Sequence, residues 1–99
     1  MMQQLPIQQP VVDAVVALIR KEVGRFGLRD VRVVPATDFD GEPAIFVHAD
    51  YEAEGDPVDT KITSRLVSKV CDIVWNLGET RFPYLKHHFN EDQKIAGLS

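Results

Sequence analysis

The first pattern of apolar and polar positions in the chain has the period of a helix. Six apolar residues fall on one side of a helical repeat: Val12, Val15, Val16, Ile19, Val23 and Phe26. Such a stripe is typical of an amphipathic helix that packs one side on a core. Pro10 suits the first turn, because a helix leaves that backbone N–H unpaired, and Gly27 suits the left-handed residue that ends a helix. We therefore predict a helix over residues 10–26.

Two segments with strand patterns follow. Val31, Val33 and Val34 predict a strand over residues 30–34, which we expect Pro35 to end because proline cannot donate to a sheet ladder. Asp40 and Gly41 suit a reversing turn. Over residues 44–52 the side chains alternate, with Ile45, Val47, Ala49 and Tyr51 on one face and Phe46, His48 and Asp50 on the other. We predict an antiparallel hairpin whose first face packs on the core.

A second helical stripe covers residues 58–77. Its apolar members are Ile62, Leu66, Val70, Ile73, Val74 and Leu77, and Val67, Cys71 and Trp75 widen it. Asp56 or Asp59 can cap the first turn, and Gly78 can end the helix. The apolar side is wider than a two-stranded hairpin needs, so we expect this helix to meet a further element or another subunit.

The segment over residues 81–89 is rich in aromatic side chains, so we expect it to pack on the domain, with a short edge strand over residues 84–89. The predicted fold is a single α+β domain over residues 10–89 in the order helix, strand, strand, helix, in which both helices cover the hairpin. A flexible lead-in at residues 1–9 and a polar tail at residues 90–99 flank it.

The predicted sheet is small. Two strands alone are marginal, because independent stability normally needs a third strand or substantial helix packing. Pairing of strand edges between two copies would extend the sheet. We therefore predict a homodimer, to which the aromatic tail and the broad apolar side of the second helix contribute.

Charge and composition narrow the classes of function. The chain has 99 residues and a formal net charge of −4, which disfavours a general nucleic-acid binder because phosphate backbones attract Lys and Arg. A basic partner is electrostatically easier. A single cysteine excludes an internal disulfide and suits a reducing, cytoplasmic location. No stretch approaches the roughly 20 apolar residues that span a bilayer, so we expect no membrane association.

Candidate ligand or metal residues are His48, Asp50, His87 and His88, because imidazole and carboxylate groups bind transition metals. Adjacent strand residues point to opposite faces, so His87 and His88 cannot easily share one ion, and His88 joins His48 only if their strands pair. No third ligand is fixed. The acidic stretch over residues 50–55 is similar to the front of a calcium loop, but Lys61 stands where such a loop has its bidentate Glu.

Catalytic motifs are absent from the sequence. It has no Gly-x-Ser-x-Gly turn, no phosphate-binding glycine loop and no dinucleotide fingerprint. Cys71 lies among apolar residues of the second helix, where its thiol stays protonated and packs. We therefore assign no catalytic residue and no cofactor, and we favour a non-enzymatic protein while leaving enzyme activity open.

Interface anchors are the residue types best represented near the carboxyl end. The candidates are Trp75, Arg81, Phe82, Tyr84, Leu85 and Phe89, of which Arg81 suits a carboxylate on a partner. We expect a non-enzymatic interaction protein, an acidic partner or inhibitor of a basic protein. The alternative is a small-molecule or metal-binding protein, or a small enzyme, that uses His48, Asp50 and the tail histidines.

Nucleic-acid binding is the third candidate function. Its candidate patch interleaves cations with rings that can stack on bases, namely Arg81, Tyr84, Lys86, His87, His88 and Phe89. The order helix, strand, strand, helix is similar to half of a KH-type RNA-binding domain. The Gly-x-x-Gly of that domain is missing between the predicted helices, so the likeness implies no function.

Overall fold

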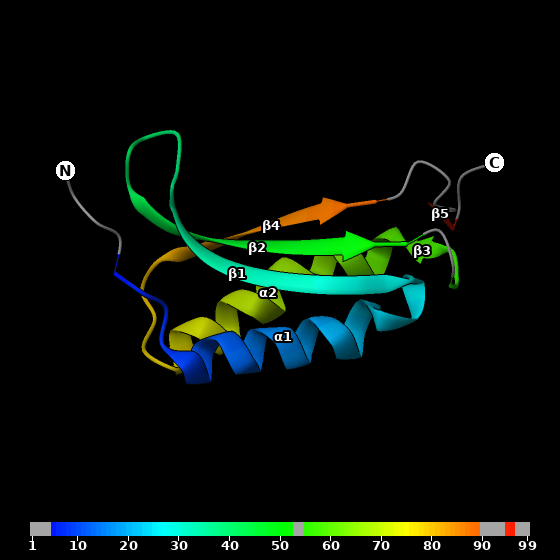
Figure 1. The fold of residues 1–99 in the computed structure, drawn as a ribbon, viewed down its shortest axis with the longest axis horizontal. Helices are drawn as coiled ribbons and strands as arrows, with labels where there is room; N and C mark the ends of the chain where they lie inside the picture. Colours follow the sequence, from blue (N-terminus) through cyan, green and yellow to red (C-terminus); the bar gives the residue numbers. More distant parts are fainter. Residues whose placement is uncertain (1–4, 53–54, 90–94, 97–99) are drawn as a thin grey trace.

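The computed structural model describes residues 5–52, 55–89 and 95–96 (Figure 1). The two helices are α1 (Gln9–Val23) and α2 (Thr60–Asn76), and a short 3-10 turn, η1 (Gly24–Phe26), follows α1. The strands are β1 (Leu28–Thr37), β2 (Pro43–Tyr51), β3 (Val58–Asp59), β4 (Phe82–His88) and β5 (Ile95–Ala96). This order confirms the predicted α+β architecture, including the C-terminal strand.

The main sheet has the strand order β1-β2-β4, so β2 is central. β1 and β2 form the predicted antiparallel hairpin, whereas β4 pairs with β2 in parallel after the crossover through α2. A separate small ladder joins β3 to β5. The third strand of the main sheet therefore comes from the same chain, and the sheet does not need a second copy to reach three strands.

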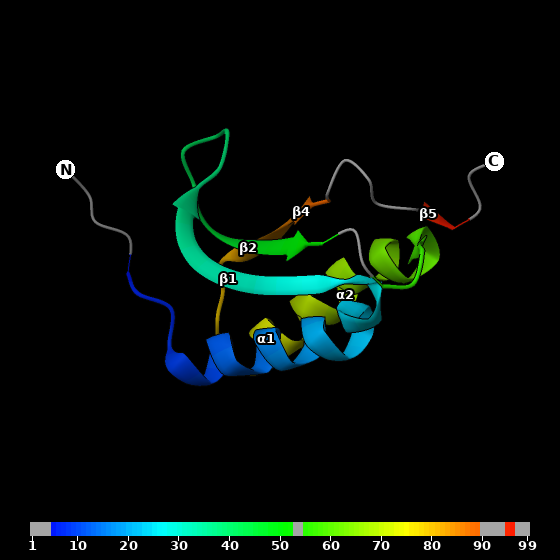
Figure 2. The ribbon, with the colours of Figure 1, turned by 45° about the vertical axis from the view of Figure 1, so that its right-hand side comes forward.

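Both helices lie against one face of the sheet (Figures 1 and 2). The core between the layers contains Val15, Ile19 and Val23 of α1 together with Leu66, Val70 and Val74 of α2. From the sheet, β2 contributes Ile45, Val47, Ala49 and Tyr51, which are the four residues that alternation assigned to the core. Cys71 is also buried, and burial raises the pKa of its thiol, as a packing role requires.

The helix predicted over residues 58–77 begins at Thr60, because Val58 and Asp59 form β3, and the strand predicted over residues 84–89 spans Phe82–His88. Two further predicted boundaries were wrong for identifiable reasons. β1 continues through Pro35 to Thr37, because β1 lies at the edge of the sheet and alternate N–H groups of an edge strand have no strand to pair with. The regular part of α1 ends at Val23 rather than at residue 26, and the 3-10 turn carries the chain to Gly27, whose φ of 89° gives the expected left-handed end. Asp59 caps α2 by accepting a hydrogen bond from the backbone of Lys61.

The loop after β2 lies directly on the turn after α1. The backbone N–H of Glu52 donates to the carbonyl of Gly27, and that of Asp56 donates to the carbonyl of Arg25, both at 2.8 Å. Gly55 makes this approach possible, since its φ is +120° and a Cβ there would lie 2.5 Å from the backbone nitrogen of Gly27. Ala53 and Glu54, part of the acidic stretch, lie outside the described residues.

Candidate functional site

The face of the sheet opposite the helices is not covered by any helix or strand of the described chain (Figure 2). Strand register arranges its side chains in rows across β1, β2 and β4. One row is Arg32, His48 and Lys86, and the next is Val34, Phe46 and Tyr84. We call this side the open face. It combines rings and charges, unlike the apolar face beneath it.

A run of aromatic side chains crosses the open face and reaches the end of α2. Ring centroids are 5.8 Å apart for Phe46 and Tyr84, 4.9 Å for Tyr84 and Phe82, and 6.5 Å for Phe82 and Trp75. Trp75 is 50% exposed and Phe82 is 42% exposed, and Phe39 in the hairpin loop is fully exposed. These five residues are called the aromatic surface below.

A pocket of about 260 Å³ lies where the hairpin loop meets the open face. Its lining consists of Thr37, Asp38, Phe39, Phe46, Tyr84 and Lys86. The ammonium of Lys86 lies 5.2 Å from the centroid of the Phe46 ring, which is a cation–π distance. The pocket thus has ring walls with one acid and one base at its rim.

Asp38 is held in place by the turn that it caps. Its Oδ1 accepts hydrogen bonds from the backbone N–H groups of Asp40 and Glu42, at 2.9 and 3.0 Å. Within the part of the chain that the structure describes, its Oδ2 accepts only a long hydrogen bond, of 3.4 Å, from the hydroxyl of Tyr84. Partial desolvation and the charge of Asp38 raise the pKa of Tyr84. The pocket therefore presents a fixed negative charge beside its rings.

The structure brings His48 and His88 together on the open face. Nδ1 of His48 and Nε2 of His88 share a hydrogen bond of 2.9 Å, and the two rings are nearly parallel. Burial lowers the pKa of His48, and the nearby charge of Arg32 lowers it further. A hydrogen bond between two imidazoles needs one ring nitrogen without a proton, so at least one of the two rings is neutral in this contact. Asp50 forms an ion pair of 3.8 Å with Arg32.

His87 lies on the other face of β4, as alternation requires. Its Nδ1 shares a hydrogen bond of 2.9 Å with the Tyr51 hydroxyl, and its ring stacks on Phe89. Burial lowers the pKa of His87 and raises the pKa of Tyr51 to about 12. His87 therefore cannot join His48 and His88 in one site.

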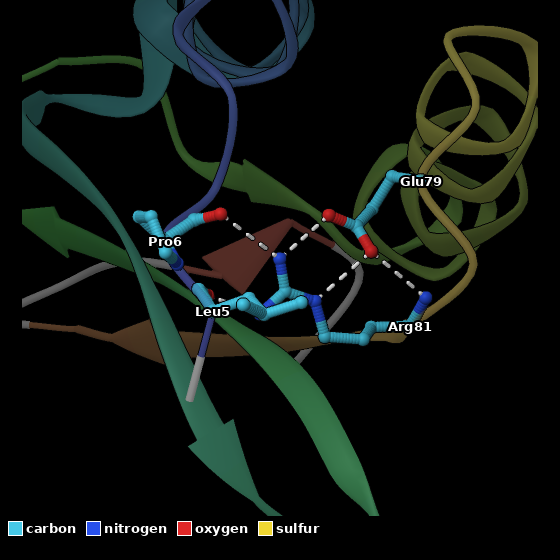
Figure 3. Close-up of polar contacts among 4 residues, drawn as sticks. All are labelled: Leu5, Pro6, Glu79 and Arg81. Carbon is cyan, nitrogen blue, oxygen red and sulfur yellow. Dashed lines mark hydrogen bonds and ion pairs between the residues drawn. The ribbon is translucent and has the colours of Figure 1, made fainter. Parts of the chain in front are cut away.

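Arg81 is used inside the molecule (Figure 3). Its guanidinium donates two hydrogen bonds to the Glu79 carboxylate, at 2.8 and 2.9 Å, and also binds the carbonyl oxygens of Leu5 and Pro6. Its side chain is only 12% exposed. The carboxylate that Arg81 binds is therefore one of this chain, and the contact holds Leu5 and Pro6 against the start of β4.

The predicted interface residues divide into two groups. Trp75, Phe82 and Tyr84 belong to the aromatic surface, whereas Leu85 packs against the core on the opposite face. Phe89 is 38% exposed and stacks on Tyr51. Sequence reasoning did not single out Asp38 and Phe39, because their pocket exists only once the hairpin loop and β4 lie side by side. The alternation of β2 did place Phe46 opposite the core.

The described part of the chain holds no group of three or more His, Cys, Asp or Glu side chains arranged to bind a metal ion. Within the same residues, no helix combines the length and the apolar character that crossing a membrane requires. Searches with this chain match no protein-family model, no curated protein and no solved structure.

Proposed function

We propose that this protein is a non-enzymatic interaction module that binds another, basic protein through the aromatic surface. The observation that carries the proposal is the exposure of Trp75 and Phe82, which lie in one run of rings with Tyr84 and Phe46, together with the exposure of Phe39, which lines a pocket beside Phe46 and Tyr84. Exposed aromatic residues contribute most of the binding energy at many protein interfaces, and contiguous apolar patches on a soluble domain typically mark such sites.

The charges near the aromatic surface favour a basic protein over a nucleic acid. Lys86 and Arg32 are the basic residues of the row that contains His48, and Arg32 already forms an ion pair with Asp50. Arg81, which also belongs to the candidate nucleic-acid patch, is bound to Glu79. With a net charge of −4, the chain repels phosphate backbones and attracts cationic partners.

Site-specific photocrosslinking in the native host tests this proposal. A photoreactive phenylalanine analogue replaces Phe39 or Phe82, and a control replaces Ala17, which is exposed on α1. We expect a discrete adduct with the same basic protein from both aromatic positions and none from position 17. Adducts of equal yield from all three positions, or from none of them, would contradict the proposal. Circular dichroism checks that each variant is folded.

A second candidate function, metal-ion binding, is favoured by the contact between His48 and His88. Two imidazoles can chelate one zinc, copper or nickel ion while water or a bound molecule fills the other positions. Calorimetry with zinc should then show one site in the wild type and none in His88→Gln. A wild type that releases no heat would reject this candidate, and His87→Gln is the matched control because His87 lies on the other face.

A further inference from the structure

We infer that the pocket between the hairpin loop and β4 binds the guanidinium group of an arginine side chain from the partner, an inference that rests on the proposed function. The pocket volume, about 260 Å³, lies just below the range of small-molecule sites, which begins at about 300 Å³. A space of this size suits one long side chain better than an entire cofactor.

The ring walls favour a cation. Phe39, Phe46 and Tyr84 line the pocket, and the faces of aromatic rings carry the negative part of their quadrupole. Lys86 demonstrates the preference within the chain itself, since its ammonium already lies over Phe46. A planar guanidinium can stack on a ring and donate hydrogen bonds in its plane at the same time, which an ammonium cannot do.

Asp38 supplies the acceptor for those hydrogen bonds. Its Oδ1 accepts hydrogen bonds from two backbone N–H groups of the turn, but among the described residues Oδ2 accepts only the 3.4 Å hydrogen bond from Tyr84. A guanidinium stacked on Tyr84 or Phe39 could donate to Oδ2. The two turn contacts hold the carboxylate in position before the ligand arrives, which lowers the ordering cost of binding.

Replacing Lys86 distinguishes a cationic ligand from an anionic one, because the affinity changes in opposite directions. For a cationic ligand, the ammonium of Lys86 is a like charge that competes for Phe46, so removing it strengthens binding. For an anionic ligand, such as a carboxylate or a phosphate, Lys86 is the attractive group and its removal weakens binding. Removing the charge of Asp38 should weaken the binding of a cationic ligand and strengthen the binding of an anionic one.

Titration of the folded protein with N-acetylarginine amide, followed by amide chemical shifts in NMR spectra, tests the inference. The neutral isostere N-acetylcitrulline amide is the matched probe. We expect saturable shifts at Thr37, Asp38 and Phe39 with the arginine probe and at least about tenfold weaker binding of citrulline. Asp38→Asn should weaken arginine binding about five- to tenfold, because Asn keeps an oxygen for the turn but loses the charge. Lys86→Gln should strengthen it.

Asp72→Asn, a loss of the same charge on the exposed side of α2, should leave the affinity unchanged. Equal binding of both probes, or weaker arginine binding in Lys86→Gln, would overturn the inference. Saturable shifts with acetate or inorganic phosphate that disappear in Lys86→Gln would also overturn it, in favour of an anion site. Crosslinks from positions 39 and 82 without any arginine binding would refute the pocket assignment alone, whereas arginine binding without crosslinks would refute the proposed function.

Discussion

Gly55 lies where the neighbouring backbone leaves no room for a side chain. It combines a positive φ with a separation of 2.5 Å between a hypothetical Cβ and the backbone nitrogen of Gly27. Gly55→Ala must therefore displace the loop and weaken the hydrogen bonds from Glu52 and Asp56. We predict a loss of about 2–4 kcal/mol in the free energy of unfolding, measured by urea denaturation.

Gly78→Ala is the matched control for this prediction. Gly78 also has a positive φ, of 89°, but a Cβ there meets no heavy atom within 4 Å. Its replacement should cost only the strain of the left-handed conformation, about 1–2 kcal/mol. Equal losses for the two variants would show that crowding against Gly27 is not what makes Gly55 necessary.

His87 makes stability depend on pH. Burial lowers its pKa in the folded protein, so below its unfolded pKa of about 6.5 the unfolded chain binds more protons than the folded one. The free energy of unfolding should therefore be level above neutral pH and should fall as the pH decreases from about 6.5 toward the lowered pKa. In His87→Gln this fall should be smaller, while His48, whose pKa is also lowered, retains its own share.

Urea denaturation of the wild type and His87→Gln at about pH 7.5 and 5.5 measures this difference, on the two sides of the ordinary histidine pKa. His88→Gln is the comparison on the open face. An unchanged pH dependence in His87→Gln would mean that burial does not lower the pKa of His87 in the folded protein.

Alternation predicted which face of the sheet each side chain lies on, but it did not predict which side chains of other strands it contacts. The period of two assigned Ile45, Val47 and Tyr51 to the core and separated His87 from His88. The contact between His48 and His88 depends on the register of β2 against β4, which lie far apart in sequence. No local pattern determines that register, because turn geometry sets it only between strands joined by a short loop.

At the level of elements, β4 has the greatest effect on the fold. It is the third strand of the main sheet, and it buries Pro83 and packs Leu85 on the core. We predict that a chain ending at Gly78 shows no cooperative unfolding transition in circular dichroism, because it loses the third strand together with the packing of Pro83 and Leu85, and the hairpin then depends on the helices alone. A chain that ends at Phe89 should keep the transition, and a folded chain of residues 1–78 would contradict the prediction.

Sequence patterns identified each main element but not the way the strands join. Helical periodicity and the Asp40–Gly41 turn gave α1, α2 and the hairpin, and aromatic density gave β4. The parallel pairing of β4 with β2 follows from the crossover through α2, because a helix between two strands returns the chain to the same end of the sheet. Pro35 misled the prediction because the sequence did not reveal that β1 would be an edge strand.

At the scale of the molecule, charge and the aromatic surface act in opposite directions on self-association. The third strand comes from the same chain, so a homodimer is not needed to complete the sheet. The exposed apolar residues Trp75 and Phe82 are what still favours a homodimer. Two copies with a charge of −4 repel each other, so a homodimer held by rings should strengthen as salt screens the repulsion. A complex with a basic partner should weaken under the same conditions.

Light scattering at micromolar concentration and increasing salt measures the first effect. We expect the average mass to rise toward that of a dimer in the wild type and to stay at that of a monomer in Trp75→Ser with Phe82→Ser. A wild type that stays monomeric at every salt concentration would reject the homodimer. A dimer that persists in the double variant would place its interface elsewhere.

The strict alternation along β4 has a consequence for how this protein can change over time. Neighbouring residues of this strand have different roles, since Leu85 packs against the core while Tyr84 and Lys86 line the pocket on the open face. Substitutions at every second position can therefore alter what the molecule recognises at little thermodynamic cost. Such a strand lets one small scaffold acquire new specificities while its architecture stays constant.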